Sequence, residues 1–133
     1  MTNQEQQDQS STSNEADAVV GERKLMEDRL AKTTEIRSKG LDPYPPRFDR
    51  THTSVEAISL FEEEEADYSG EVDAHPRTET VRVAGRIMAR RGMGKAAFID
   101  LKDGHGAIQA FARQNTMGDE AYEIVNLLDI GDI

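Results

Sequence analysis

Two aromatic residues and one amide occur at spacings that would place them together on one face of a small β-sheet. Phe98 lies opposite the small apolar residues of the alternating stretch 96–102, and Gln109 and Phe111 do so in the stretch 107–113. Rings can stack on bases, and an amide can hydrogen-bond to a base edge. The spacing is typical of a surface for single-stranded nucleic acid, and ordinary packing of the two rings explains it equally well.

The segment before these two stretches is basic. Residues 81–95 contain five cationic side chains and no acidic one: Arg82, Arg86, Arg90, Arg91 and Lys95. The net charge of the chain is −10, but residues 61–80 carry eight acidic side chains and one basic, whereas residues 81–133 carry seven of each. The acidity of the chain therefore does not argue against phosphate binding by the strand region.

Three short strands are expected to position these side chains. The inward sets are Val81, Val83, Ile87 and Ala89 in the first strand, Ala97, Ile99 and Leu101 in the second, and Ile108, Ala110 and Ala112 in the third. Residues 90–94 should form a glycine-flanked connector, and residues 103–106 a turn whose two glycines can adopt positive φ.

The residues before the strands divide into three parts. Residues 1–20 are polar and acidic and are expected to be a disordered tail. A helix over 22–39 should end at Gly40, followed by an extended proline-rich arm over 41–48. A second, short helix should have Thr53 or Ser54 as its N-cap with Glu56 in capping reach, and should bury Val55, Ile58 and Phe61. A linker over 67–76 then leads into the strands, so that the predicted domains are 1–20, 21–77 and 78–133.

After the third strand the pattern predicts a helix over 116–128 with an apolar stripe: Tyr122, Ile124, Val125 and Leu128. Residues 129–133 look like the beginning of a further strand. Because three strands cannot close a barrel, we expect the sequence to be truncated at its carboxyl end.

Composition and motifs give no support for an active site in this chain. The chain has no cysteine, which fits a reducing compartment, and no apolar run of membrane-spanning length or secretory signal, so a cytoplasmic protein is expected. His52, His75 and His105 are not spaced as metal ligands. We therefore predict no catalytic residue, no metal site and no cofactor within these residues.

From Arg23 to the last residue the chain resembles the amino-terminal region of bacterial class II lysyl-tRNA synthetases. The motifs that carry the resemblance are RKL at 23–25, GLDPYP at 40–45, FDRTHT at 48–53, VAGRIM at 83–88, RGMGK at 91–95, GAIQA at 106–110 and LDIGDI at 128–133. The arm, the FDRTHT run and the RGMGK connector favour the lysyl branch over the aspartyl and asparaginyl branches.

This resemblance implies an OB-fold anticodon-binding domain, a five-stranded Greek-key barrel that is mainly β with flanking helices and is here incomplete. It further implies that Phe98 and Gln109 stack on and read anticodon bases and that Arg90 and Arg91 form a basic pair at that site. Gly85 matches a glycine where the first strand bends. The implied partner is the anticodon loop of lysine tRNA. ATP and Mg²⁺ would be needed by the complete enzyme, which would be a homodimer, and its catalytic domain lies outside this sequence.

Three hypotheses follow from the sequence. The first is that the chain is the anticodon-binding part of a lysine–tRNA ligase, which joins lysine to its tRNA with ATP. The second is a stand-alone OB-type module that binds single-stranded nucleic acid and has no enzyme activity. The third is a protein-interaction domain that docks a partner through the proline arm and the helices.

Overall fold

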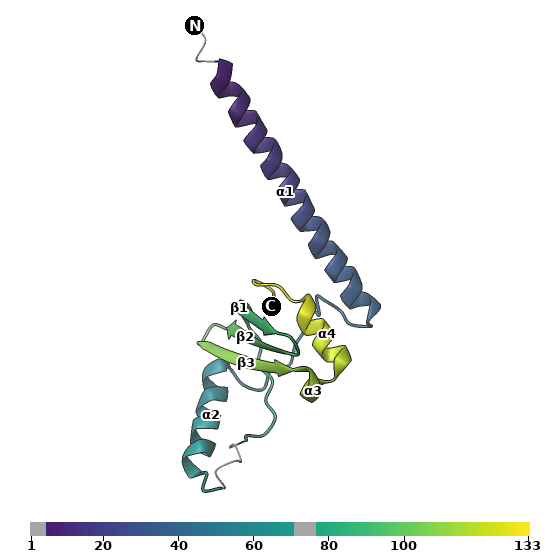
Figure 1. The fold of residues 1–133 in the computed structure, drawn as a ribbon. Helices are drawn as coiled ribbons and strands as arrows, with labels where there is room; N and C mark the ends of the chain where they lie inside the picture. Colours follow the sequence, from purple (N-terminus) through teal and green to yellow (C-terminus); the bar gives the residue numbers. More distant parts are fainter. Residues whose placement is uncertain (1–4, 71–76) are drawn as a thin grey trace. The chain divides into compact units, whose positions relative to one another are not determined.

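The computed structural model describes residues 5–70 and 77–133, and the side chains from residue 15 onward, so that part of the predicted 67–76 linker lies outside it. The chain divides into two compact units, Met1–Tyr44 and Pro45–Ile133. The elements in chain order (Figure 1) are α1 (Glu5–Ser38), α2 (Ser54–Asp67), β1 (Arg86–Met93), β2 (Ala96–Lys102), β3 (Ala107–Arg113), α3 (Gln114–Met117) and α4 (Asp119–Leu127).

The first unit contains α1, which begins at Glu5 and not near residue 22. In the structure residues 5–20 form the first turns of this helix, where the sequence predicts a disordered tail, and residues 1–4 of that tail lie outside the described residues. The stretch contains neither glycine nor proline to interrupt the backbone ladder. None of the described side chains of α1 is buried, and the helix therefore has no apolar face that would mark its beginning in the sequence. Its end is as predicted: Gly40 has φ +81°, and its N–H donates to the Arg37 carbonyl at 3.0 Å.

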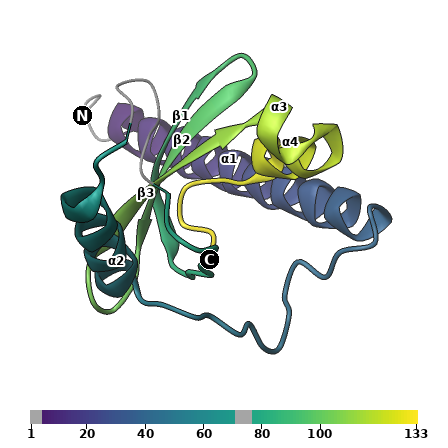
Figure 2. The same cartoon turned by 90° about the horizontal axis from the view of Figure 1, so that it is seen from below.

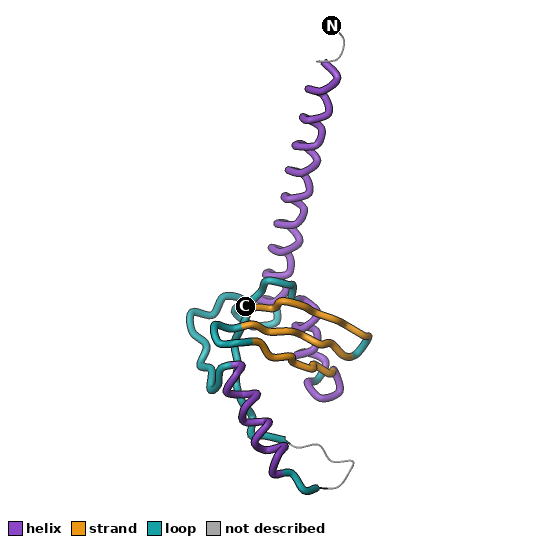
Figure 3. Tube along the Cα trace, turned by 90° about the vertical axis from the view of Figure 1, so that its left-hand side faces the viewer, coloured by secondary structure: helices purple, strands orange, loops and turns teal. Residues whose placement is uncertain are grey.

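The second unit is built on an antiparallel sheet in the order β1-β2-β3, seen as three adjacent strands in Figure 3. β1 and β2 are joined by a two-residue turn, Gly94 and Lys95, in which Gly94 has φ +60°. The expected connector over 90–94 is wrong, because Arg90 to Met93 belong to β1. The strand also begins later than predicted, so Val81 and Val83 precede it and only Ile87 of the expected inward set is buried.

A β-bulge in β1 changes the side to which its residues point. The register shifts between Ile87 and Ala89, with Ile87 opposite Leu101 and Ala89 opposite Asp100. One extra residue in one strand reverses the alternation beyond it. Ala89 therefore lies on the face that was predicted for the arginines. Arg90, opposite Ile99, lies on the core face.

The core lies between one face of the sheet and α4. Its buried side chains are Ile87, Ala97, Ile99, Ala112, Tyr122 and Val125. The inward sets predicted for the second and third strands are confirmed, with Leu101 and Ala110 packed against this cluster. The single helix expected over 116–128 is two helices, because Gly118 between them has φ +88°. Tyr122 donates from its hydroxyl to the carbonyl of Gly94 at 3.1 Å and so fixes α4 to the β1–β2 turn.

Helix α2 lies at the end of the sheet that carries the β2–β3 turn (Figures 1 and 2). The predicted N-cap is confirmed: the Thr53 hydroxyl accepts from the Glu56 N–H, and the Glu56 carboxylate accepts from the Thr53 N–H at 2.8 Å. The predicted buried face is only partly correct, with Ile58 half-buried. Ser54 and Ala57 are the buried residues of α2, whereas the Val55 and Phe61 side chains are exposed.

The β2–β3 turn is held by a carboxylate and not by left-handed glycines. Asp103 accepts hydrogen bonds from the N–H and hydroxyl of Ser54 and from the N–H groups of His105 and Gly106. The bond from the Ser54 N–H, with the others, holds the pKa of Asp103 well below its usual range. Gly104 and Gly106 do not have positive φ. The turn and the first turn of α2 are therefore one connected structure.

Residues 129–133 lie beside β1 and are joined to it by two backbone hydrogen bonds. Ile87 donates to Asp132 O, and Gly131 donates to Ile87 O, both at 2.8 Å. The expected strand is not formed in this segment, which contains a turn at Ile130 and Gly131.

Candidate nucleic-acid interface

The face of the sheet opposite the core, here called the outer face, follows from the strand register. Its residues are Arg86, Ala89, Arg91 and Met93 in β1, Ala96, Phe98, Asp100 and Lys102 in β2, and Ala107, Gln109, Phe111 and Arg113 in β3. Cross-strand partners share a face, so these side chains form rows across the strands. The parities predicted for the second and third strands are confirmed.

The central row holds Arg91, Phe98 and Phe111, and Arg113 approaches the second ring from the neighbouring row. Phe98 lies directly opposite Phe111, with ring centroids 4.5 Å apart and ring planes 15° apart. The guanidinium of Arg113 lies over the Phe111 ring, 5.5 Å from its centroid. Phe111 is 52% exposed, which leaves much of this ring surface in contact with solvent. Neither ring belongs to the buried core, so the packing interpretation of the two rings does not account for them.

The next row holds an amide beside a carboxylate. Gln109 lies opposite Asp100, and its Nε2 donates to Asp100 Oδ1 at 3.0 Å. Gln109 is exposed and Asp100 is half-buried. The amide therefore has hydrogen-bonding capacity left over for a ligand while one of its N–H groups is already used.

The structure separates the two arginines of the predicted site. Arg91 lies opposite Phe98, is exposed and belongs to the outer face. Arg90 lies on the core face, where its Nη2 donates to Asn126 Oδ1 at 2.9 Å. Its Nε is buried and has no hydrogen-bond partner within the described part of the chain. Arg91, Phe98 and Gln109 are thus brought together, and Arg90 is not.

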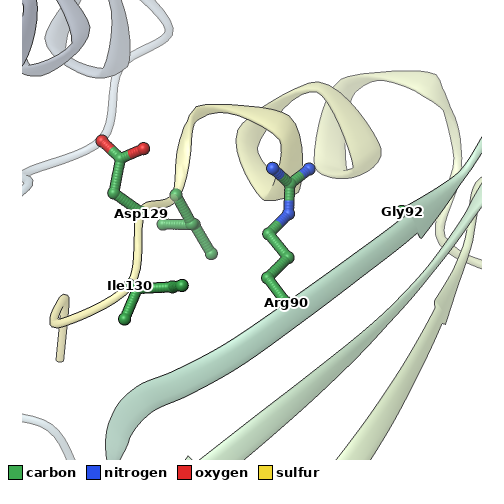
Figure 4. Close-up of a pocket in the computed structure, with 5 residues that line it drawn as sticks. Arg90, Gly92, Asp129 and Ile130 are labelled. Carbon is green, nitrogen blue, oxygen red and sulfur yellow. The ribbon is translucent and has the colours of Figure 1, made fainter.

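Arg90 borders a hollow of about 390 Å³ beside β1, shown in Figure 4. The other lining residues are Gly92, Leu128, Asp129 and Ile130. The hollow lies on the core side of the strand, so a ligand on the outer face would not reach this guanidinium.

The outer face is cationic although the chain is acidic. It carries four basic side chains and one acidic: Arg86, Arg91, Lys102 and Arg113 against Asp100. One of the four has a further role, since Arg86 Nη1 donates to the Gly131 carbonyl at 3.0 Å. Rings, an amide and surplus positive charge on one surface are what a single strand of nucleic acid requires. Arg113 and Asp100 were missed as site residues, although the alternation of the strands that contain them places both on this face.

The described residues contain no metal-binding group of three or more His, Cys, Asp or Glu side chains. Within the same ranges, no helix has the length and apolar character needed to cross a bilayer.

Residues 81–133 match the tRNA anticodon family described as an OB-fold nucleic acid binding domain. Together with the three-stranded sheet and its flanking helices, this match confirms the predicted fold class of an incomplete OB-fold.

Similarity to individual proteins extends further along the chain. It is 46% identical over 109 residues to a lysine–tRNA ligase of Carboxydothermus hydrogenoformans, covering 82% of this chain and 20% of that protein. A lysine–tRNA ligase of Pelotomaculum thermopropionicum is 46% identical over 109 residues, with 82% and 19% covered. One from Bacillus cereus is 40% identical over 105 residues, with 79% and 20% covered. The chain thus spans about a fifth of the length of these curated relatives.

Proposed function

Because residues 81–133 match an OB-fold nucleic acid binding domain and the chain is 46% identical over 109 residues to a lysine–tRNA ligase, we propose that its outer face binds the anticodon loop of lysine tRNA. Unpaired anticodon bases would stack on the Phe98–Phe111 pair and hydrogen-bond to Gln109. Arg91 and the other cations of the face would contact the phosphates between those bases. Bases splayed out of a loop are the usual targets of sequence-specific RNA recognition.

One observation carries this proposal: two stacked rings, a half-satisfied amide and an exposed arginine occupy adjacent rows of one sheet face. Stacking contributes affinity with little dependence on the base, whereas the amide distinguishes base edges. The face therefore combines a general and a specific element of recognition.

Binding of short RNA hairpins to the chain tests the proposal. Fluorescence anisotropy would compare a hairpin with the anticodon loop of lysine tRNA and one of the same stem with a changed anticodon. We expect the first to bind at least about tenfold more tightly, since each well-paired base contributes about 1–3 kcal/mol of discrimination. Equal affinity for both hairpins would contradict anticodon recognition and favour a module for single strands in general.

We extend the proposal to the longer protein, of which this chain would be the anticodon-recognising part. That protein would form the lysyl adenylate from lysine and ATP with Mg²⁺, transfer lysine to its tRNA, act as a homodimer and work in the cytoplasm. The support is the similarity to proteins named as lysine–tRNA ligases. An aminoacylation assay of the longer protein with lysine tRNA tests the proposed ligase activity. Loss of that activity after Gln109→Ala would show that it depends on anticodon binding by the outer face.

A further inference from the structure

Asp100 is the one carboxylate on the outer face, in a row between Ala89 and Gln109. Its position is unfavourable for a surface that binds a polyanion, because a negative charge repels the phosphates that the four cations attract. Anticodon binding by the rings, the amide and the cations does not require the Asp100 carboxylate. The hydrogen bond between Asp100 and Gln109 indicates a role for this carboxylate.

The hydrogen bond between Gln109 Nε2 and Asp100 Oδ1, 3.0 Å long, can be made in one sense only. An ionised carboxylate accepts hydrogen bonds and cannot donate, so Gln109 must turn its NH₂ group toward Asp100. If the amide turned over, its Oε1 would lie against the carboxylate, and two acceptors would repel each other. Asp100 thereby determines which end of the Gln109 amide is offered to a ligand.

We infer that Asp100 is a positioning residue for base recognition: it fixes the Gln109 amide so that Oε1 and the second N–H face the bound base in a single order. This inference rests on the proposed function of the outer face. A freely rotating amide can present either a donor or an acceptor at one position and so accepts two kinds of base edge. A fixed amide accepts one kind, which raises discrimination while the carboxylate lowers affinity for every RNA.

The first test needs no RNA. The side-chain amide of Gln109 gives two proton resonances in a ¹H–¹⁵N NMR spectrum, and the proton bonded to Asp100 should be shifted downfield in the chain. Asp100→Ala, which removes the acceptor, should bring it toward the position of a solvent-exposed glutamine. An unchanged Gln109 signal in the variant would show that Asp100 does not hold the amide, and would overturn the inference.

The second test uses the two hairpins described above. Asp100→Asn keeps the shape of the side chain but lets residue 100 donate as well as accept, so both orientations of the amide become possible. We expect the ratio of the two dissociation constants to fall by at least about threefold, while affinity for both hairpins stays the same or rises. A variant with lower affinity for both and an unchanged ratio would overturn the inference.

The chain offers a matched control away from the sheet. Gln114 Nε2 donates to Asp119 Oδ1 at 2.8 Å, which is the same pair of groups between α3 and α4. Asp119→Asn removes the same charge and likewise allows both orientations of the neighbouring glutamine amide, and should leave the ratio of dissociation constants unchanged. Asp100→Glu, which keeps an acceptor-only carboxylate, should retain more of the discrimination than Asp100→Asn does.

A double-mutant cycle separates this inference from the proposed function. In a Gln109→Ala background, Asp100→Asn should change the ratio no further, because the amide that it orients is gone. A further fall in that background would mean that Asp100 acts by another route, and would overturn the inference alone. A ratio of one in the unmodified chain would instead refute the proposed function, and the positioning role with it.

Discussion

At the scale of single residues, the outer face combines one ring that is half-buried with one that is largely in solvent. Phe98 is held between β1 and β3, whereas Phe111 lies on β3 and is 52% exposed. The two stacked rings together offer a larger aromatic surface than one ring alone. The guanidinium of Arg113 lies over the more exposed ring, that of Phe111. Such a surface can receive a base without rearrangement of the core.

Phe98→Ala should weaken binding of the lysine anticodon hairpin by about 1–3 kcal/mol, the usual effect of losing one aromatic–base stack. Titration by fluorescence anisotropy measures the change. Phe61→Ala is a suitable control, because Phe61 is also an exposed ring but lies on α2. A comparable loss in both variants, or a loss of thermal stability that explains the weaker binding, would place Phe98 outside the binding surface.

Arg91 and Arg90 should respond differently to substitution because they lie on opposite faces of β1. Arg91→Ala should reduce the slope of log K against log salt concentration by about 0.7, the value for one phosphate contact on a single strand. Arg90→Ala removes the hydrogen bond to Asn126 and should instead lower the free energy of unfolding by about 1 kcal/mol. RNA titrations over a range of salt concentrations and chemical denaturation distinguish the two. An equal fall in slope for both variants would refute this assignment.

At the scale of elements, the sequence predicts helix ends and strand faces best where a short local pattern is enough to determine them. Thr53 and Glu56 could be recognised as a capping box, and Gly40 as a helix end, because both are local. The alternation in β2 and β3 could be read because those strands have no irregularity. The bulge in β1 could not be foreseen, since nothing in residues 86–93 shows which one will be left without a partner, and this is why Arg90 was placed with Arg91.

The face of α2 was mispredicted for a different reason. Its apolar residues suggest that Val55 and Phe61 are buried, but Ser54 is nearly inaccessible because it bonds to Asp103 across 49 positions of sequence. A long-range polar contact overrides the apolar pattern of a short helix. In α1 the first residues, 5–17, are polar or small and form no apolar stripe at helical spacing, so the sequence predicts a helix only from residue 22 onward.

The contact between α2 and the β2–β3 turn should make stability depend on acid pH. Hydrogen bonds from Ser54, His105 and Gly106 depress the pKa of Asp103 below its usual 3.8. A group with a depressed folded-state pKa stabilises the fold fully above its unfolded pKa, and this stabilisation is lost as the pH falls toward the folded value. Asp103→Asn should therefore lower the melting temperature at pH 7, and the difference from the unmodified chain should narrow below about pH 4. A difference that is constant between pH 7 and pH 3 would contradict this account.

Close backbone approach explains the glycine just before β1. A Cβ added at Gly85 would lie 2.8 Å from the Lys102 carbonyl oxygen, whereas one added at Gly92 would meet nothing within 4 Å. Gly85→Ala should therefore lower the free energy of unfolding by about 1–3 kcal/mol, as overpacking usually does. Gly92→Ala, in the same strand region, should be neutral or slightly stabilising. Chemical denaturation of the two variants compares them, and equal effects would show that the backbone at residue 85 can move aside.

At the scale of the whole molecule, the distribution of charge matters more than its sum. The net charge of −10 would repel RNA, yet the outer face has four cations and one carboxylate. The acidic residues are concentrated elsewhere, with Glu62 to Glu65 forming a continuous exposed run on α2. An approaching RNA is repelled at long range by the acidic residues and attracted at short range by the cations of the outer face. Moderate salt screens the long-range repulsion and leaves the short-range contacts.

Replacing residues 62–65 together by glutamine should therefore raise the affinity for both hairpins by a similar factor, because this run repels any polyanion and contacts no base. The gain should be clear at about 50 mM salt and should nearly vanish at about 500 mM, where the screening length is only a few ångströms. Discrimination between the two hairpins should not change, since the outer face is untouched. Anisotropy titrations at both salt concentrations measure these quantities. A gain that persists at high salt, or one confined to the cognate hairpin, would mean that α2 takes part in the binding surface itself.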